Sequence, residues 1–173
     1  TAHPALSADE KTLYFASDRP GGYGGSDLWK VSITEHGFGT PQNLGPNINT
    51  EARETFPFVN SNNELYFSSD GRIGLGGLDV YATKIRPDGS MTEVQNVGAP
   101  INSNADDFAY YIDYESKHGF VSSNREGGQG NDDIYSFIEH RALQFDCIQA
   151  LRLMVVDSKT RNIIPDATVT LYD

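Results

Sequence analysis

The chain has 173 residues, 38% of them hydrophobic and 21% charged, which is typical of a globular protein and excludes an intrinsically disordered one. Thirteen Lys and Arg residues against 24 Asp and Glu residues give a formal net charge of −11. An acidic surface of this kind repels a phosphate backbone, so no nucleic-acid partner is predicted. No apolar run approaches the roughly 20 residues that cross a bilayer, so no membrane span is predicted either. Cys147 is the single cysteine, which excludes an internal disulfide and a multi-cysteine zinc site.

Three glycine-rich segments of similar sequence recur along the chain, and each ends in an aspartate, an apolar residue and an aromatic residue. They are SDRPGGYGGSDLW at 17–29, SDGRIGLGGLDVY at 69–81 and SNREGGQGNDDIY at 123–135, which begin 52 and 54 residues apart. A second shared stretch, LGPNIN at 44–49 and VGAPIN at 97–102, keeps nearly the same offset. Two blocks that share one offset indicate a repeated structural unit.

Each repeat is predicted to form four short antiparallel strands, because apolar and polar residues alternate within it and turn residues separate the runs. In the first repeat the predicted strands cover 3–6, 12–17, 26–33 and 42–44. Four such strands in about 50 residues are typical of one blade of a β-propeller. The predicted fold is therefore all-β, with a partial propeller of about three four-stranded blades that belong to a larger ring. The blades are expected at 1–44, 45–97 and 98–138, the third without a recognisable fourth strand, and we expect the chain to be a fragment of a longer protein.

The first repeat is similar to the WD-like propeller repeats of TolB and its relatives. The residues that carry this resemblance are His3-Pro4, Ser7-Ala8-Asp9, Tyr14-Phe15-Ala16-Ser17-Asp18-Arg19 and Asp27-Leu28-Trp29. The later repeats depart from the pattern: Asn60-Ser61-Asn62 replaces Ser-x-Asp in the second, and Tyr110 replaces the proline in the third.

The repeat pattern stops after about residue 138, and no glycine follows. Residues 139–150 are predicted to be a linker, although the spacing of Leu143, Cys147 and Leu151 leaves a helix open. Residues 151–173, LRLMVVDSKTRNIIPDATVTLYD, resemble the opening hairpin of a carboxypeptidase-regulatory-like domain. The first strands of a β-sandwich are therefore expected there.

This order of parts resembles the OmpA-family envelope proteins of Bacteroidota, in particular the PorE-like members associated with type IX secretion. The resemblance implies a non-enzymatic scaffold in the periplasm, associated with the outer membrane, that links a secretion machine or envelope complex to the cell wall. Its expected partners are proteins of that complex, and peptidoglycan through a C-terminal domain outside this sequence. The alternative is a substrate-gating propeller of a TolB-like or prolyl-oligopeptidase-like protein.

Nine residues form the repeat signature, three at each equivalent position: Asp27, Asp79 and Asp133; Trp29, Tyr81 and Tyr135; Gly24, Gly76 and Gly130. The aspartates are predicted to accept backbone N–H bonds that close the loops, the aromatic rings to pack between sheets, and the glycines to allow tight loops. Residues 127–135 also match a calcium-binding nonapeptide, but this motif binds calcium in tandem copies, so a structural role is favoured.

No catalytic, cofactor-binding or metal-binding residues are predicted. His3, His36, His118 and His140 lack the spacing of metal-binding motifs, and His3 is expected to pack on an inner strand. The sequence has no G-x-S-x-G nucleophile motif, and no Lys-Ser/Thr pair follows the glycine-rich loops.

Overall fold

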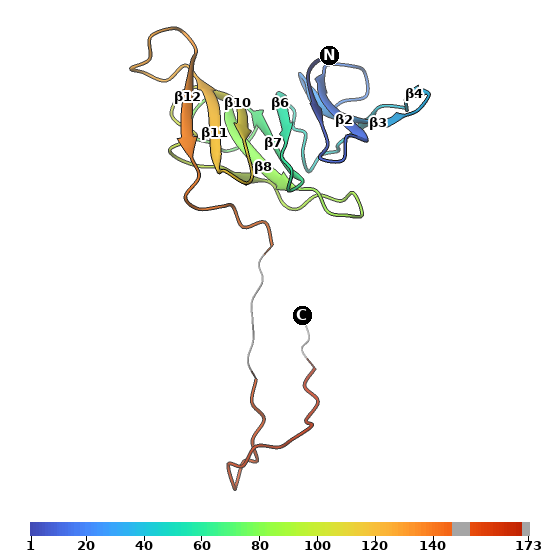
Figure 1. The fold of residues 1–173 in the computed structure, drawn as a ribbon, viewed down its shortest axis with the longest axis vertical. Helices are drawn as coiled ribbons and strands as arrows, with labels where there is room; N and C mark the ends of the chain where they lie inside the picture. Colours follow the sequence, from blue (N-terminus) through green and yellow to red (C-terminus); the bar gives the residue numbers. More distant parts are fainter. Residues whose placement is uncertain (147–152, 171–173) are drawn as a thin grey trace.

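The computed structural model describes residues 1–146 and 153–170, and these residues contain β-strands and loops but no helix (Figure 1). Twelve strands form three antiparallel sheets. Within the described ranges there is accordingly no helical segment that could cross a membrane. The all-β class predicted from the repeats is confirmed.

The first sheet has five strands and the second has four, whereas the third has three. The first sheet comprises β1 (Ala2–Leu6), β2 (Thr12–Ser17), β3 (Asp27–Thr34), β4 (Gly37–Phe38) and β5 (Gln42–Asn43). The second comprises β6 (Glu54–Val59), β7 (Glu64–Ser69), β8 (Asp79–Lys84) and β9 (Gln95–Asn96). The third comprises β10 (Asp107–Ile112), β11 (His118–Ser123) and β12 (Asp133–Ile138). The four strands predicted in the first repeat agree with β1, β2, β3 and β5 to within one residue, and the short β4 was not predicted.

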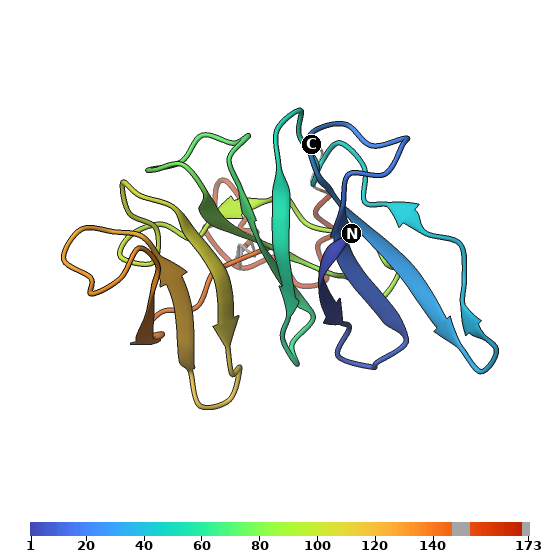
Figure 2. The same cartoon turned by 90° about the horizontal axis from the view of Figure 1, so that it is seen from above.

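The three sheets lie side by side in chain order (Figure 2). Their inner strands β1, β6 and β10 contact one another in sequence. Each inner strand has an irregular register, and each irregularity contains a residue with positive φ: His3 at 52°, Phe56 at 48° and Ala109 at 52°. The ring of His3 stacks on that of Phe56 at 3.9 Å, as its predicted inner-strand position implies. The described residues form an open stack and no closed ring.

Apolar side chains fill both spaces between neighbouring sheets. The cluster between the first and second sheets consists of Tyr14, Ala16, Leu28, Ile48, Val59, Leu65, Phe67 and Tyr81. The cluster between the second and third sheets consists of Tyr66, Val80, Ala82, Tyr110, Ile112 and Val121. Burial of each large side chain is worth roughly 1.5–3 kcal/mol, so these two clusters hold the stack together. A third, smaller cluster of Phe15, Trp29 and Val31 lies on the other face of the first sheet.

Lowering the pH is expected to destabilise the stack through His3. Burial lowers the pKa of His3 below its ordinary value of 6.5, so the folded chain favours the neutral ring. The resulting stabilisation is complete above the unfolded-state pKa and declines as the pH falls through it. Thermal melts at about pH 8 and about pH 5.5 measure this, with His3→Asn as the control because Asn tolerates positive φ. If the parent chain and His3→Asn lost the same thermal stability between the two pH values, the expectation would be contradicted.

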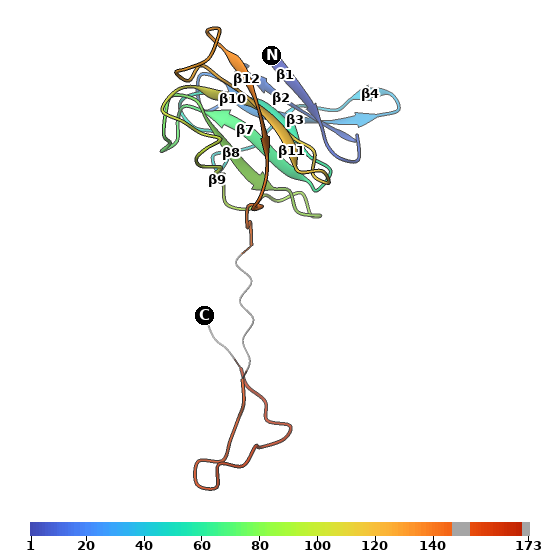
Figure 3. The ribbon, with the colours of Figure 1, turned by 60° about the vertical axis from the view of Figure 1, so that its left-hand side comes forward.

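The segment 151–173, where the first strands of a β-sandwich are predicted, is described over 153–170 and contains no extended strand in that part. Only one isolated bridge, between Val156 and Ile163, forms there. Ile163 is 67% exposed and Val169 49% exposed, so neither is packed on a sheet among the described residues. A two-stranded hairpin is marginal in water without a third strand or a packing partner, and the sandwich stays a prediction. This segment lies apart from the three sheets in both side views (Figures 1 and 3).

The predicted linker, 139–150, is described up to residue 146 and contains no regular element in that part. Leu143 and Phe145 pack against the cluster between the second and third sheets. Cys147 and Leu151, on which the helical alternative depends, lie outside the described residues, as do 171–173.

Candidate functional site

The recurring aspartate closes the glycine-rich loop in all three sheets. Each carboxylate accepts hydrogen bonds from two consecutive backbone amides, four and three residues before it. The pairs are Tyr23 (2.7 Å) and Gly24 (3.0 Å) for Asp27, Leu75 (2.9 Å) and Gly76 (3.1 Å) for Asp79, and Gln129 (2.9 Å) and Gly130 (3.1 Å) for Asp133. The carboxylates therefore make the loop-closing contacts that the sequence predicts.

The recurring aromatic residue occupies one register position in each sheet. Trp29 lies opposite Phe15, Tyr81 opposite Phe67, and Tyr135 opposite Val121. An arginine guanidinium lies over each ring: Arg19 at 5.2 Å from Trp29, Arg72 at 5.9 Å from Tyr81, and Arg125 at 4.9 Å from Tyr135. Cation–π attraction of this kind contributes about 0.5–1 kcal/mol at exposed sites and more where water is excluded.

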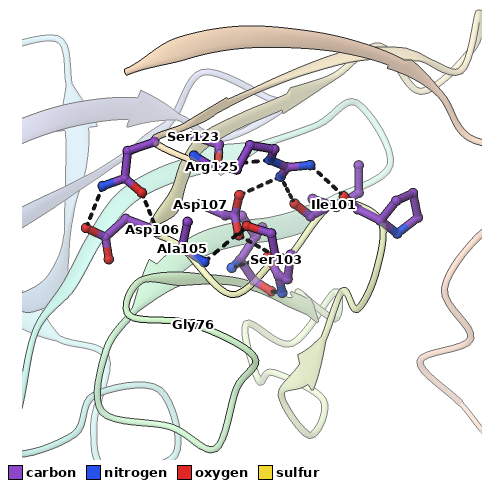
Figure 4. Close-up of polar contacts among 12 residues, drawn as sticks. Gly76, Ile101, Ser103, Ala105, Asp106, Asp107, Ser123 and Arg125 are labelled. Carbon is purple, nitrogen blue, oxygen red and sulfur yellow. Dashed lines mark hydrogen bonds and ion pairs between the residues drawn. The ribbon is translucent and has the colours of Figure 1, made fainter. Parts of the chain in front are cut away.

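Two of these arginines connect their sheet to the chain segment that leads into it. Arg72 donates from Nη2 to the carbonyl oxygens of Asn47 at 2.6 Å and Ile48 at 3.0 Å. Arg125 donates from Nη1 to the carbonyl oxygen of Pro100 at 3.0 Å and from Nη2 to that of Ile101 at 2.6 Å (Figure 4). The same contact is thus built at both junctions between sheets.

The first residue of the inner strand is a buried acid at both junctions. Glu54 accepts hydrogen bonds from the backbone and hydroxyl of Thr50, both at 2.7 Å. Asp107 accepts from the backbone of Ser103 at 2.5 Å and from its hydroxyl at 2.9 Å, and it pairs with Arg125 Nη2 at 2.5 Å (Figure 4). Asp107 is fully buried, so this ion pair is shielded from water.

A buried asparagine ties each junction to the outer part of the sheet. Asn49 accepts from the Leu28 amide at 2.8 Å and donates to the Leu28 carbonyl at 3.0 Å. Asn102 makes the same two bonds with Val80, both at 2.8 Å. Each side chain therefore pairs with the strand edge as a further strand residue would.

Gly24 and Gly76 pack directly against the segment that leads to the next sheet. A methyl group at Gly24 would overlap the carbonyl oxygens of Thr50 and Ala52, and one at Gly76 would overlap those of Ser103 and Ala105. Gly130 differs, because the nearest heavy atom to such a methyl group would be 3.4 Å away. The first two glycines are needed for close approach between sheets, whereas the third has no such contact among the described residues.

Gly76→Ala is expected to destabilise the chain by about 1–3 kcal/mol, because the backbone at Ala105 has to move away from the new methyl group. Gly130→Ala is the matched control at the same repeat position, and we expect a change within about 0.5 kcal/mol. Urea denaturation of both variants and the parent chain measures the difference. Equal losses of stability for the two substitutions would contradict the role of Gly76 in the close approach between sheets.

Sequence reasoning missed the arginines, the buried acids and the buried asparagines of the junctions. The second shared stretch already contained Asn49 and Asn102. Extending its alignment by five residues places Glu54 opposite Asp107, and this signal could have identified the acids. The arginines follow Ser17, Ser69 and Ser123 by two, three and two residues, and this unequal spacing hides their equivalence.

A polar groove of about 830 Å³ opens between the first two sheets, at the ends of the strands away from the glycine-rich loops. The side chains that line it include Asp9, Lys30, Gln42, Asn62, Lys84 and Arg86. Hydrogen bonds from Ser7 and the Lys11 amide lower the pKa of Asp9, so this carboxylate is ionised at neutral pH. The groove can therefore offer both charges and amide groups to a polar partner.

The described residues contain no group of three or more His, Cys, Asp or Glu side chains arranged to hold a metal ion. The three signature aspartates stay in separate loops, one in each sheet, and are not brought together. The loop at 127–135 has the same carboxylate–amide bonds as the two loops that lack the calcium motif, which favours the structural role.

Comparison with known proteins gives no match, either among protein-family models or among curated proteins. The OmpA-family resemblance of the repeats stays a prediction.

Proposed function

We propose that the three sheets are blades of a β-propeller and that the chain is a non-enzymatic protein-interaction module. The proposed setting is the periplasm, in an outer-membrane-associated protein of the OmpA family that links a secretion machine or envelope complex to the cell wall. Family and location rest on the sequence resemblance, which is an argument by analogy.

One observation carries the interaction role: the recurring polar residues hold the fold itself. Asp27, Asp79 and Asp133 bind the amides of their own loops, and Arg72 and Arg125 bind the carbonyls between sheets. Residues that recur for this reason build a rigid framework, on which variable loops can be presented to partners.

The polar groove between the first two sheets is the proposed partner surface. Lys30, Lys84 and Arg86 place three cations around it in a chain whose net charge is −11. Lys84 and Arg86 already contact Glu64 and Asp146, so they are oriented by the fold. A groove that presents these cations fits a partner segment that carries carboxylates and amides.

Site-specific photo-crosslinking in the source cells tests the proposal. A photoreactive residue at Asn62, on the rim of the groove, is expected to crosslink to envelope proteins in the outer-membrane fraction. The same residue at the exposed position Ile73, in the glycine-rich loop of the second sheet, is the control and is expected to give none of these crosslinks. Recovery of the protein in the cytosol, or a hydrolase domain downstream in the same polypeptide, would contradict the proposal.

A further inference from the structure

The segment that follows the third sheet covers the second junction, the one between the second and third sheets. It leaves β12 at the end away from the glycine-rich loop and has no regular element up to residue 146 (Figure 1). Leu143 and Phe145 are half-buried and pack against the apolar cluster of this junction. Gln144 and Asp146, which alternate with them, are exposed. Such alternation is typical of an extended segment with one edge on the stack.

Two polar contacts hold this segment in place. Gln95 Nε2 donates a hydrogen bond to the carbonyl oxygen of Gln144 at 2.7 Å. Arg86 Nη2 pairs with the Asp146 carboxylate at 3.3 Å. A side-chain amide of the sheet therefore binds the backbone of the segment, and a cation binds its carboxylate.

The first junction, between the first and second sheets, repeats the position of this amide. Gln95 lies opposite Ala82 in the second sheet, and Gln42 lies opposite Lys30 in the first. Side chains of directly opposed residues share one face of a sheet. Gln42 and Lys30 accordingly both line the polar groove of this junction. Gln42 is exposed there, so its amide is available to a backbone carbonyl, as that of Gln95 is to Gln144.

Lys30 gives the first junction a charge that the second lacks at this position. Its equivalent, Ala82, is fully buried in the apolar cluster, whereas Lys30 is half-buried and lines the groove. The other two cations of the groove, Lys84 and Arg86, are already paired with carboxylates. In the described part of the chain Lys30 has no such pair, and the acid of the groove, Asp9, accepts hydrogen bonds within its own turn.

The groove also has apolar side chains that a docked segment can contact. Tyr14 belongs to the cluster between the first and second sheets, and Ile85 packs against that cluster. Both line the groove. Tyr14 occupies the register position of Tyr66, which belongs to the cluster that Leu143 and Phe145 contact.

We propose that the groove of the first junction binds an extended segment of a partner protein, in the way that residues 143–146 cover the second junction. The Gln42 amide donates to a backbone carbonyl of the segment, apolar side chains of the segment contact Tyr14 and Ile85, and Lys30 pairs with its carboxylate. The partner segment therefore alternates apolar and polar residues and carries an acid beside them. This inference rests on the proposed interaction role of the groove and names the chemistry of its partner.

The probe is the acetylated peptide amide Ala-Leu-Gln-Phe-Asp, which copies residues 142–146. It is titrated into the isotope-labelled 173-residue chain, and the shift of each backbone amide is followed by NMR. We expect saturable shifts at Lys30, Gln42 and Ile85 with a dissociation constant of about 1 mM or below, since so short a peptide buries little surface. A peptide that ends in Asn instead of Asp is expected to bind about threefold to fivefold more weakly.

Variants of the chain then test which residues hold the peptide. Lys30→Gln is expected to bind the Asp and Asn peptides equally, because the cation that distinguishes them is gone. Gln42→Ala is expected to weaken both peptides about fivefold, the effect of one hydrogen bond. Gln95→Ala is the matched control at the equivalent register position and is expected to leave binding at the groove unchanged. Lys159→Gln, at an exposed position outside the groove, is the control for Lys30→Gln.

Three results would overturn the proposal: no saturable shift up to about 2 mM peptide, shifts confined to the second junction around Gln95 and Tyr110, or a preference for the Asp peptide that survives Lys30→Gln. Crosslinks at Asn62 without binding of the peptide would leave the interaction role standing and remove this inference. Binding of the peptide without envelope crosslinks at Asn62 would do the reverse, so the two failures are distinguishable.

Discussion

Replacing Arg125 with alanine is expected to lower the free energy of unfolding by about 3 kcal/mol or more. The substitution leaves the Asp107 carboxylate fully buried without its cation, and an uncompensated buried charge is strongly destabilising. It also removes the donors to the carbonyls of Pro100 and Ile101. Urea denaturation monitored by circular dichroism provides the measurement.

Arg19→Ala is the matched control for Arg125→Ala. Arg19 lies over an aromatic ring and beside a serine hydroxyl in the same way, but no carboxylate pairs with it among the described residues. We expect a loss of about 1 kcal/mol, the size of one exposed cation–π contact or one hydrogen bond. Equal losses for the two arginines would show that the Asp107 pair contributes nothing.

Tyr81→Ala is expected to cost about 3–5 kcal/mol, since it opens a cavity in the cluster between the first and second sheets. The Tyr81 ring is 3% exposed and lies 6.0 Å from that of Phe67. Its hydroxyl donates to the Ile73 carbonyl at 3.1 Å. A loss of this size is a large share of the 5–15 kcal/mol of a typical domain, so the melting temperature falls markedly.

Two further variants separate the ring of Tyr81 from its hydroxyl and from surface effects. Tyr81→Phe removes one hydrogen bond and is expected to cost about 1 kcal/mol. Tyr23→Ala truncates a ring that is 51% exposed and is expected to change stability by less than about 0.5 kcal/mol. If Tyr81→Ala were no worse than Tyr23→Ala, the ring would not hold the sheets together.

Local patterns sufficed to predict the strands of the first repeat, except the short β4, and the closure of the glycine-rich loops. Residues 12–17 form a short run rich in apolar and aromatic residues, and Trp29, Val31 and Ile33 alternate in 26–33, so the strand signal is set within each segment itself. The bond from Asp27 to the Gly24 amide spans three residues, so turn chemistry predicts it without knowledge of the fold.

Contacts between distant segments could not be predicted in this way. The positive φ of Phe56 has no local cause in an aromatic residue, and it is set by packing of inner strands against one another. The pairing of Arg125 with Asp107 joins residues 18 positions apart, and only the folded junction brings them together. The hairpin predicted after residue 151 likewise depends on a sheet to pack on, which a local pattern does not supply.

Native-state hydrogen exchange, followed amide by amide, tests most directly whether equivalent small sheets are stacked face to face. The slowest exchange is expected in β7 and β8, because among the described residues the second sheet alone is covered on both faces. Strands β2, β3 and β11 are expected to exchange faster, and the half-exposed β12 faster still. Slowest exchange in the third sheet, or in residues 153–170, would contradict the stacked arrangement.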